Sequence, residues 1–489
     1  MSDEHSFVAL DLGAESGRAI VVTLADGTVR MRELHRWANR PVQMCGTLYW
    51  DFPYLFAEVV ESLRICADEG IEPDGISVDT WGVNYGLLDP NGKLLSNPVH
   101  YRDGRTEGIH DYTDPIMTRD EIFALTAYEP WPIASLFQLA SLRRDGSPLL
   151  DVAETFLNMP DLFHYFLTGV ARSEMSIANT SNLMSVDCTW CEPIIERFKL
   201  PRKLFDDLVE PCTVLGPLSA ELQGLTGLGE VPVIATCGHD TSAAVAAVPG
   251  EGDNWAFLSS GTWSILGTQV DAPIATARCL ELGFTNEYTV GGWYLARNIS
   301  GLWLIQELRR KWDGSDDPWD YERMTTEAAD AARAPLVNAA DGSLLAPEDM
   351  EQALHDLIVA SGQNPPSGRG ELIRGVLESL ALEYNHRLDT LAELTGRRAE
   401  AIYLVGGGIK NTLLCQLTAD ACGVPVHAGA DQCTALGNGL AQALALGLLD
   451  GPADIRRVMR ESSAMTTYEP TDASVWAEKR TRYTALQGA

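Results

Sequence analysis

The sequence has no long apolar run, no basic leader and few positive charges. The longest apolar stretch, residues 440–449, falls short of the about 18 residues that a membrane helix needs. The chain starts with MSDEHS, which is acidic and polar, so we expect no signal peptide. Lys and Arg number 36 against 68 Asp and Glu, a formal charge of −32. That charge repels phosphate backbones and anionic lipids, which argues against nucleic-acid or membrane partners.

Cysteine is also sparse, with ten residues scattered over 489 positions. This usage is typical of reduced thiols in a cytoplasmic enzyme rather than of a disulfide framework. Cys188 and Cys191 form a CxxC pair, but no second pair lies near it, so a loop is favoured over a zinc or redox site. The chain is long enough to bury a large core, and two large domains fit its length.

Short apolar strands alternate with amphipathic helices, which predicts α/β architecture. Three segments share one pattern: an apolar strand, a turn of small polar residues and a second apolar strand. Their turns are DLGAESGR, DTWG and SSGT, and each segment predicts a β-hairpin. Gly13 and Gly261, in the first and third turns, lie about half the chain apart. The repeat suggests two related domains.

The second half predicts further elements from its apolar spacing. They are a helix over 371–395 capped by Gly396, a strand over 401–405, a glycine turn, a helix over 410–422 stopped by Gly423, a strand over 424–427 and a helix over 434–449. The polar region 312–370, rich in Asp, Pro and Ala, predicts an irregular surface insertion that carries little chemistry. The last twenty or so residues predict a peripheral helix.

Three glycine-containing turns carry groups suited to phosphate and metal chemistry. In DLGAESGR, Asp11 ends an apolar strand and could hold magnesium through water, while turn amides and Arg18 could bind phosphate. An ordinary glycine turn explains that segment equally well. SSGTWS offers hydroxyls and amides. VGGGIKN lets a flat group approach a helix N-terminus, although it is neither a Walker nor a Rossmann motif.

A fourth turn, GHDT at 238–241, follows the apolar strand over 231–235. His239 and Asp240 could be a general base and its neighbour. Alternatively, Asp240 is the N-cap of the following apolar helix. The histidines elsewhere stand singly and suggest structural or surface roles, as at His100, His164 and His427.

Taken in order, the motifs identify a family resemblance. DLGAESGR, DTWGVNYGLLD, YRDGRT, MPDLFHYFLTG, GHDTSAAV, LSSGTWS, NISGLWLIQELR, YLVGGGIKNTLLCQLTADACGVPV and ALGNGLAQALALG together resemble the FGGY carbohydrate kinases. The resemblance extends from residue 5 to about residue 475. It implies an α/β, actin-like (ribonuclease-H-like) fold with an interdomain active-site cleft. The implied domains are 1–248, which carries the sugar and the phosphate loop, and 249–489, which carries the nucleotide.

The resemblance also implies roles for particular residues. Asp240 would be the catalytic base, and Asp11 would orient magnesium through water. The sugar would contact Gly82, His239, Asp240, Thr241 and Asn298. The nucleotide would contact Ala14, Glu15, Ser16, Gly17, Arg18, Thr262, Gln306 and Gly407.

The implied reaction is phosphorylation of a ketose by Mg²⁺-ATP in the cytoplasm, with L-rhamnulose phosphorylated at its 1-hydroxyl during L-rhamnose catabolism. L-fuculose or L-xylulose is an alternative acceptor, and a non-transferring sugar-sensing ATPase is an alternative function. Two departures from the family pattern bear on the site: Glu15 replaces a small residue in the phosphate loop, and Asn84 replaces an acid near the sugar. The oligomeric state stays open.

Overall fold

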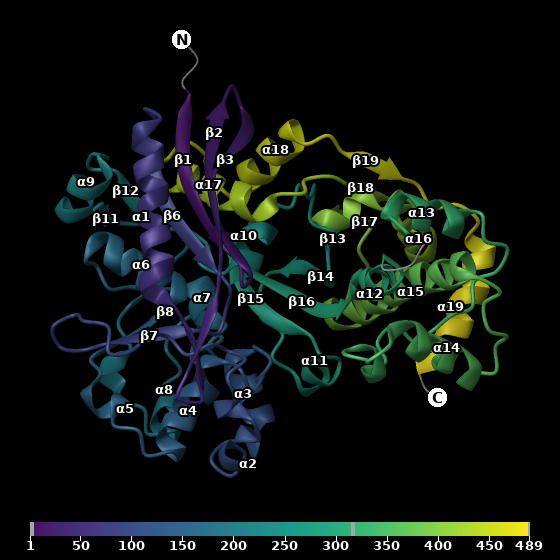
Figure 1. The fold of residues 1–489 in the computed structure, drawn as a ribbon, viewed down its shortest axis with the longest axis horizontal. Coiled ribbons are helices and arrows are strands. Elements are labelled where there is room, and N and C mark those ends of the chain that lie inside the picture. The colour runs from purple at the N-terminus through teal and green to yellow at the C-terminus, as the bar shows by residue number, and fades with distance from the viewer. Residues whose placement is uncertain (1–3, 314–317, 488–489) are drawn as a thin grey trace. The chain divides into compact units, whose positions relative to one another are not determined.

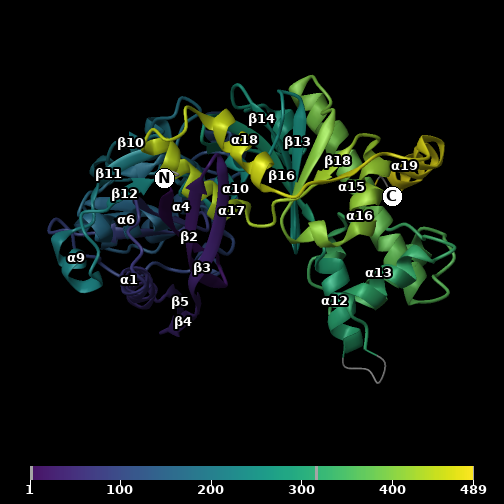
Figure 2. The same cartoon turned by 90° about the horizontal axis from the view of Figure 1, so that it is seen from above.

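The computed structural model describes residues 4–313 and 318–487. The chain forms two compact units, and neither unit is one continuous segment. Unit 1 comprises Met1–Pro249, Val270–Leu295 and Gln432–Ser462, and unit 2 comprises Gly250–Gln269, Ala296–Asp431 and Ser463–Ala489. In Figures 1 and 2, helix α17 (Cys433–Ala445), near the yellow end of the colour scale, lies beside the purple N-terminal strands of unit 1. The division into domains 1–248 and 249–489, which the family resemblance implies, stays a prediction.

The main sheet of unit 1 has the strand order β11-β12-β6-β1-β2-β3. These strands are β1 (His5–Leu12), β2 (Ser16–Ala25), β3 (Thr28–Ala38), β6 (Gly75–Thr80), β11 (Thr213–Pro217) and β12 (Pro232–Ala235). Strands β1 and β2 form the first predicted hairpin, and β6 lies parallel to both β1 and β12. The predicted hairpin at DTWG is wrong. Because β1 and β12 occupy both edges of β6, the strand after that turn, β7 (Tyr85–Leu88), pairs instead with β8 (Thr155–Asn158).

Helices cover both faces of this sheet. On one face, side chains such as Val8 and Leu10 share a core with α1 (Phe52–Asp68) and α6 (Met159–Thr168). On the other face, α17 approaches so closely that a Cβ added at Gly439 would lie 2.5 Å from Val22. A Cβ at Gly437 would lie 2.0 Å from a carbonyl oxygen of α10 (Asp240–Ala246). The two glycines of ALGNGLAQ therefore allow α17 to pack against the sheet and against α10.

The remaining elements of unit 1 are short. The strands are β4 (Pro41–Met44), β5 (Thr47–Trp50), β9 (Ser173–Glu174), β10 (Leu208–Val209) and β15 (Thr285–Thr289). The helices are α2 (Ile109–Thr113), α3 (Arg119–Thr126), α4 (Ser135–Arg144), α5 (Leu149–Val152), α7 (Met175–Asn179), α8 (Glu192–Arg197), α9 (Ala220–Thr226), α11 (Ala277–Glu281) and α18 (Pro452–Ser462), with 3₁₀ turns η1 (Gly104–Thr106) and η2 (Arg202–Leu204). Many of the helices share a second core with β7 and β8.

The second large sheet has the order β15-β16-β14-β13-β17-β18-β19. Its further strands are β13 (Trp255–Ser260), β14 (Trp263–Val270), β16 (Gly292–Ser300), β17 (Ala401–Val405), β18 (Val426–Ala428) and β19 (Thr466–Tyr468). The hairpin predicted at SSGT is confirmed by the antiparallel pairing of β13 with β14, and the strand predicted over 401–405 is β17. Helix α15 (Arg369–Thr395) ends at Gly396 with φ 75°, as predicted.

Unit 2 also contains α12 (Trp303–Asp313), η4 (Gly407–Lys410), α16 (Thr412–Cys422) and α19 (Ala473–Gln487). The prediction of an irregular 312–370 is wrong, because this region forms α13 (Tyr321–Ala329), η3 (Gly342–Leu344) and α14 (Met350–Ala360). Residues 314–317 lie outside the described part of this region. Asp320 and Asp349 are side-chain N-caps of α13 and α14, so acids that suggested a loop mark helix starts.

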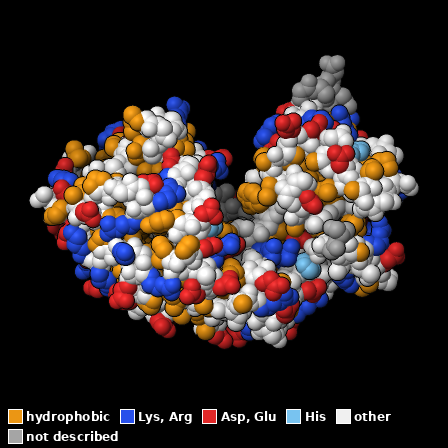
Figure 3. Space-filling view, turned by 90° about the horizontal axis from the view of Figure 1, so that it is seen from below, with side chains coloured by type: hydrophobic (Ala, Val, Ile, Leu, Met, Phe, Trp, Pro, Cys, Tyr) orange, Lys and Arg blue, Asp and Glu red, His pale blue; other side chains and the backbone are white. Residues whose placement is uncertain are grey.

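The surface carries charges of both signs. Figure 3 shows Lys and Arg interspersed with Asp and Glu over one face, so the negative charge does not gather into a single patch there. All ten cysteines are free thiols, and only Cys45 is exposed. Within residues 4–313 and 318–487, no helix is both long and apolar enough to cross a membrane.

Candidate active site

The hairpin of β1 and β2 presents the first predicted phosphate loop. Asn39 holds the turn from the side: its backbone N–H donates to the Glu15 carbonyl at 2.9 Å, and its side-chain amide donates to the Gly13 carbonyl at 2.5 Å. Gly17 must lack a side chain, because a Cβ there would lie 2.3 Å from the Trp37 ring. Glu15 is exposed, so its charge is turned to solvent.

Arg18, the cation of this loop, is held by two partners in unit 1. Its Nη2 and Nε donate to Asp11 Oδ2 at 2.6 and 3.1 Å. Its Nη1 donates to Gln432 Oε1 at 2.6 Å. The guanidinium therefore neutralises the strand-end acid and links the start of the chain to the segment that enters α17.

A second buried acid, Asp79, lies beside Asp11 because the two are register partners on β6 and β1. Asn438 of α17 donates to Asp79 Oδ2 at 2.6 Å, whereas Asp79 Oδ1 is buried without a hydrogen-bond partner among the described residues. Burial raises the pKa of Asp79 well above its ordinary value, and the Asp11 carboxylate raises it further. The unpartnered oxygen marks a place for a hydrogen-bond donor or a cation.

The GHDT turn starts α10, but Asp240 is not its N-cap. The N-cap is His239, and Asp240 is the first helical residue. The Asp240 carboxylate accepts from the backbone N–H of Thr241 at 2.6 Å and from its hydroxyl at 3.2 Å. Its side chain is 29% exposed, which leaves it reachable by a substrate hydroxyl. Burial raises the pKa of Asp240, His239 opposes that rise, and Asp11 adds to it.

The backbone of this turn is fixed by a buried glutamate that the sequence did not single out. Glu174 Oε2 accepts from the Gly238 N–H at 2.9 Å and from the Ser176 hydroxyl at 2.6 Å. The Ser176 oxygen in turn accepts from the His239 N–H at 3.3 Å. Burial raises the pKa of Glu174 to about 7. Both peptide N–H groups before Asp240 are therefore anchored.

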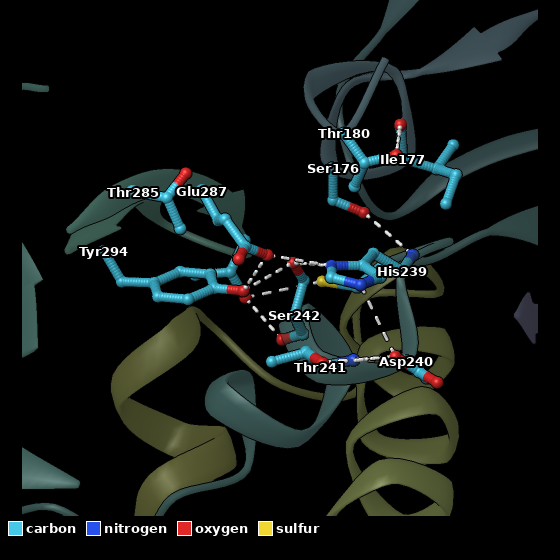
Figure 4. A network of polar contacts seen from close by, with 12 residues as sticks. Ser176, Ile177, Thr180, His239, Asp240, Thr241, Ser242, Thr285, Glu287 and Tyr294 are labelled. Carbon is cyan, nitrogen blue, oxygen red and sulfur yellow. Dashed lines mark hydrogen bonds and ion pairs between the residues drawn. The ribbon is translucent and has the colours of Figure 1, made fainter. Parts of the chain in front are cut away.

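The His239 side chain lies in a polar network that Figure 4 shows from close by. Its Nδ1 is 2.9 Å from Glu287 Oε2, and its Nε2 is 3.5 Å from Asp240 Oδ1. Tyr294 donates its hydroxyl to the same Glu287 oxygen at 2.6 Å, and Ser242 lies 3.1 Å from the Tyr294 hydroxyl. Sequence reasoning missed Glu287, because TNEYT is a polar segment whose five residues are all buried.

Gly82 and Asn84 lie in the turn after β6. A Cβ at Gly82 would approach Thr180 to 3.2 Å, so the peptide packs tightly against α7 and its end. Asn84 is buried, and its Oδ1 accepts from the indole N–H groups of Trp50 and Trp81 at 2.9 and 3.0 Å. A carboxylate would also accept from both indoles, but an amide does so without bringing a charge into this cluster.

Unit 2 contains a cavity of about 580 Å³ that two predicted nucleotide residues line. These are Gln306 of α12 and Gly407 of η4, and Gly261 of SSGT lies in the same wall beside the predicted Thr262. Helix α13, from the region expected to carry little chemistry, contributes Tyr321, Glu322, Thr325 and Thr326 to the lining. The other two predicted residues of unit 2, Thr262 and Asn298, are exposed. The cavity is large enough for a drug-sized ligand.

Comparisons with known proteins agree with this architecture. Residues 6–247 and 256–446 match the N-terminal and C-terminal domains of the FGGY family of carbohydrate kinases. A rhamnulokinase from Bacteroides thetaiotaomicron is 38% identical over 97% of this chain and 97% of its own. A rhamnulokinase from Pectobacterium atrosepticum is 35% identical over 98% and 96%. The crystal structure of gluconate kinase from Lactobacillus acidophilus matches with a TM-score of 0.82 at 17% identity over 99% of this chain and 97% of its own, a likeness of fold alone.

Proposed function

Because the chain belongs to the FGGY family of carbohydrate kinases, we propose that it transfers the γ-phosphoryl group of ATP to the 1-hydroxyl of L-rhamnulose. The choice of sugar is supported by the relatives that are named rhamnulokinase and are 38% and 35% identical to this chain over nearly its whole length. Unit 1 would supply the phosphate loop and most of the sugar contacts, and unit 2 would supply the nucleotide cavity together with Thr262 and Asn298. The expected domains, 1–248 and 249–489, and a cytoplasmic location are part of this proposal.

Asp240 is the proposed catalytic base. A hydroxyl is a poor nucleophile until its proton is removed, and a carboxylate within hydrogen-bond reach accepts that proton as the P–O bond forms. Two features support this role: the Asp240 side chain is 29% exposed, and the Thr241 N–H and hydroxyl fix one of its oxygens. Gly82, His239, Thr241 and Asn298 are the proposed sugar contacts.

The nucleotide is proposed to bind in the cavity of unit 2 against Gln306 and Gly407. A Cβ at Gly407 would meet no atom of the described residues within 4 Å, so the glycine leaves open space where a flat base could lie. The turn amides of residues 14–18 and the Thr262 hydroxyl are the proposed phosphate contacts, with Arg18 adding positive charge.

The acidic edge of the unit 1 sheet fits a magnesium ion. Asp79 Oδ1 is buried beside Asp11 without a partner in the described chain, and carboxylate oxygens are ligands that Mg²⁺ accepts, often through water. Asp11 would orient the ion through water. When bound, Mg²⁺ would neutralise charge on the phosphate oxygens. Arg18, which pairs with Asp11 in the protein alone, would then be available to the phosphates.

A panel of ketoses in an assay that couples ADP release to NADH oxidation tests the proposal. ADP release that needs L-rhamnulose, with a product phosphorylated at the 1-position by NMR, is the expected result. Faster turnover of L-fuculose or L-xylulose than of L-rhamnulose would show that the protein is a kinase for a different ketose. ATP hydrolysis that no ketose changes would refute phosphoryl transfer and favour a sugar-sensing ATPase.

A further inference from the structure

Glu287 is a buried carboxylate in the middle of β15, and its side chain is 9% exposed. In the part of the chain that the structure describes, its one ion pair is with His239. A carboxylate removed from water at this depth needs a compensating charge or several hydrogen bonds. The imidazole of His239 can supply that charge, since no Lys or Arg side chain is paired with Glu287 in the described residues.

The geometry fixes which ring nitrogen carries the proton toward Glu287. A carboxylate only accepts hydrogen bonds, so the Glu287 oxygen at 2.9 Å favours a proton on the Nδ1 of His239. The opposite nitrogen, Nε2, then faces Asp240 at 3.5 Å. Tyr294 fixes the accepting oxygen by donating to it at 2.6 Å (Figure 4). Asp240, His239 and Glu287 therefore form, in that order, a base, its neighbour and a third group that orients the neighbour.

The His239 ring is held independently of its backbone. Ser176 and Glu174 bind the peptide N–H groups of His239 and Gly238, on the side of the turn formed by α7. Glu287 contacts the ring from β15. A change at position 287 therefore acts on the imidazole and leaves the anchors of the turn in place.

We infer that Glu287 is a positioning residue for the sugar-binding side of the site: it keeps His239 in its imidazolium form and presents Nε2–H to Asp240 and to the bound ketose. This inference rests on the proposed function, because it takes the acceptor to be a ketose held beside Asp240. A charged His239 offers a hydroxyl or carbonyl oxygen of the sugar a hydrogen bond that a neutral ring of the same tautomer cannot donate.

The groups around His239 favour the charged ring. Burial lowers the pKa of His239, but Glu287 raises it, and Asp240 and Glu174 raise it further, so that its pKa lies above the ordinary value. The neutral groups on the other elements are the hydroxyls of Ser242 on α10 and of Tyr294 on β16. Tyr128 also faces this cluster, since Glu287 and Asp240 help to raise its pKa.

Glu287→Gln tests the inference, because it keeps an acceptor of the same size and removes the charge. With the charge lost, the pKa of His239 should fall by at least about one unit, given the carboxylate at 2.9 Å. The KM for L-rhamnulose should rise about tenfold while the KM for ATP stays unchanged and kcat falls less than threefold. The matched control is Glu58→Gln, which removes the carboxylate from another Glu–His pair, His35–Glu58 at 2.6 Å, where the histidine is on β3.

Two measurements test these expectations. Imidazole ¹⁵N spectra of the whole chain, with His239→Gln to assign the resonance, give the pKa of His239. The pH profile of kcat/KM for the ketose shows whether activity follows that pKa. Since the charged ring is present below its pKa, activity should fall as pH rises through that pKa, and the fall should move to lower pH in Glu287→Gln. Glu58→Gln should leave both readings unchanged.

The inference is wrong if Glu287→Gln leaves the His239 pKa and the ketose KM as in the wild type. If Glu287→Gln does not fold, Tyr294→Phe takes its place, because it frees one hydrogen bond on the same carboxylate. Because this change loosens the carboxylate but keeps its charge, the ketose KM should rise by a smaller factor while the imidazole pKa does not fall, and an unchanged KM would overturn the inference. A wild type that phosphorylates no ketose refutes the proposed function, whereas the imidazole titration still reports on the Glu287 pairing.

Discussion

Replacing Asp240 by asparagine removes a proton acceptor and one negative charge, while the side chain keeps its shape. The amide oxygen introduced by Asp240→Asn could still accept from the Thr241 N–H, which Asp240 accepts at 2.6 Å in the native turn. If Asp240 is the base, kcat should fall at least about 100-fold, the lower end of what general-base catalysis contributes. That factor corresponds to about 2.7 kcal/mol in the activation free energy.

The effect on folding should be much smaller. A negative charge in the first helical turn stabilises a helix by about 0.3–1 kcal/mol, so its loss from α10 costs no more than that. Repulsion from Asp11, which helps to raise the pKa of Asp240, is relieved by the same change. The two effects oppose each other, and a net change below about 1 kcal/mol shifts Tm by no more than about 4 °C in domains of this size.

The assay is turnover of L-rhamnulose in the ADP-coupled reaction, with calorimetric titrations of ketose and nucleotide on the same preparation. Binding of both ligands within about threefold of wild type, together with the loss of kcat, would identify a defect in chemistry. An Asp240→Asn variant that keeps more than half of the wild-type turnover would remove Asp240 from the mechanism.

Three further predictions concern the acid pair, the cavity and the acceptor. The pKa of Asp79 is raised in the folded state, so the native protein binds this proton more tightly and its free energy of unfolding should fall as pH rises above about 4. Urea unfolding at a series of pH values should show a shallower fall for Asp79→Asn than for the wild type. The same pH dependence in both proteins would contradict this prediction. Gly407→Val should fold normally, since a Cβ there meets nothing in the described chain within 4 Å, and should raise the KM for ATP at least about tenfold. By contrast, Gly408→Ala places a Cβ 2.1 Å from Ser260 Oγ and should cost about 1–3 kcal/mol in stability; equal melting temperatures for the two variants would argue against this packing. L-rhamnulose and L-fuculose are 6-deoxy ketoses that end in a methyl group, so L-xylulose, which lacks that methyl, should lose about 10–100-fold in kcat/KM, and equal values for all three sugars would refute the choice of sugar.

Local patterns predicted the elements that are specified locally. The strand over 401–405 and the helix that ends at Gly396 follow from apolar spacing and from a glycine able to adopt φ 75°. The hairpins at DLGAESGR and SSGT follow in the same way. The turn at DTWG has the same local pattern, but sheet order decides its outcome, because both edges of β6 are already paired.

Contacts between segments that are far apart in the chain could not be predicted from the sequence. Asn438 reaches Asp79 across 359 positions, and Gln432 reaches Arg18 across 414. Glu287 lies in a strand whose polar composition hides its burial. The family resemblance predicted GHDT as a reactive turn, but only the folded chain reveals that His239 is the cap and that a second carboxylate holds its ring.

The return of residues 432–462 to unit 1 has a consequence for biosynthesis. A ribosome adds about 5–20 residues per second, so the roughly 180 residues between Pro249 and Gln432 delay the last part of this unit by roughly 10 to 40 s. During that time the nascent sheet lacks α17, the face around Val22 and Gly75 is uncovered, and Asp79 lacks Asn438. The emerging chain therefore keeps this face uncovered until about its last eighth is made, and a fragment that stops at residue 248 cannot complete its own core.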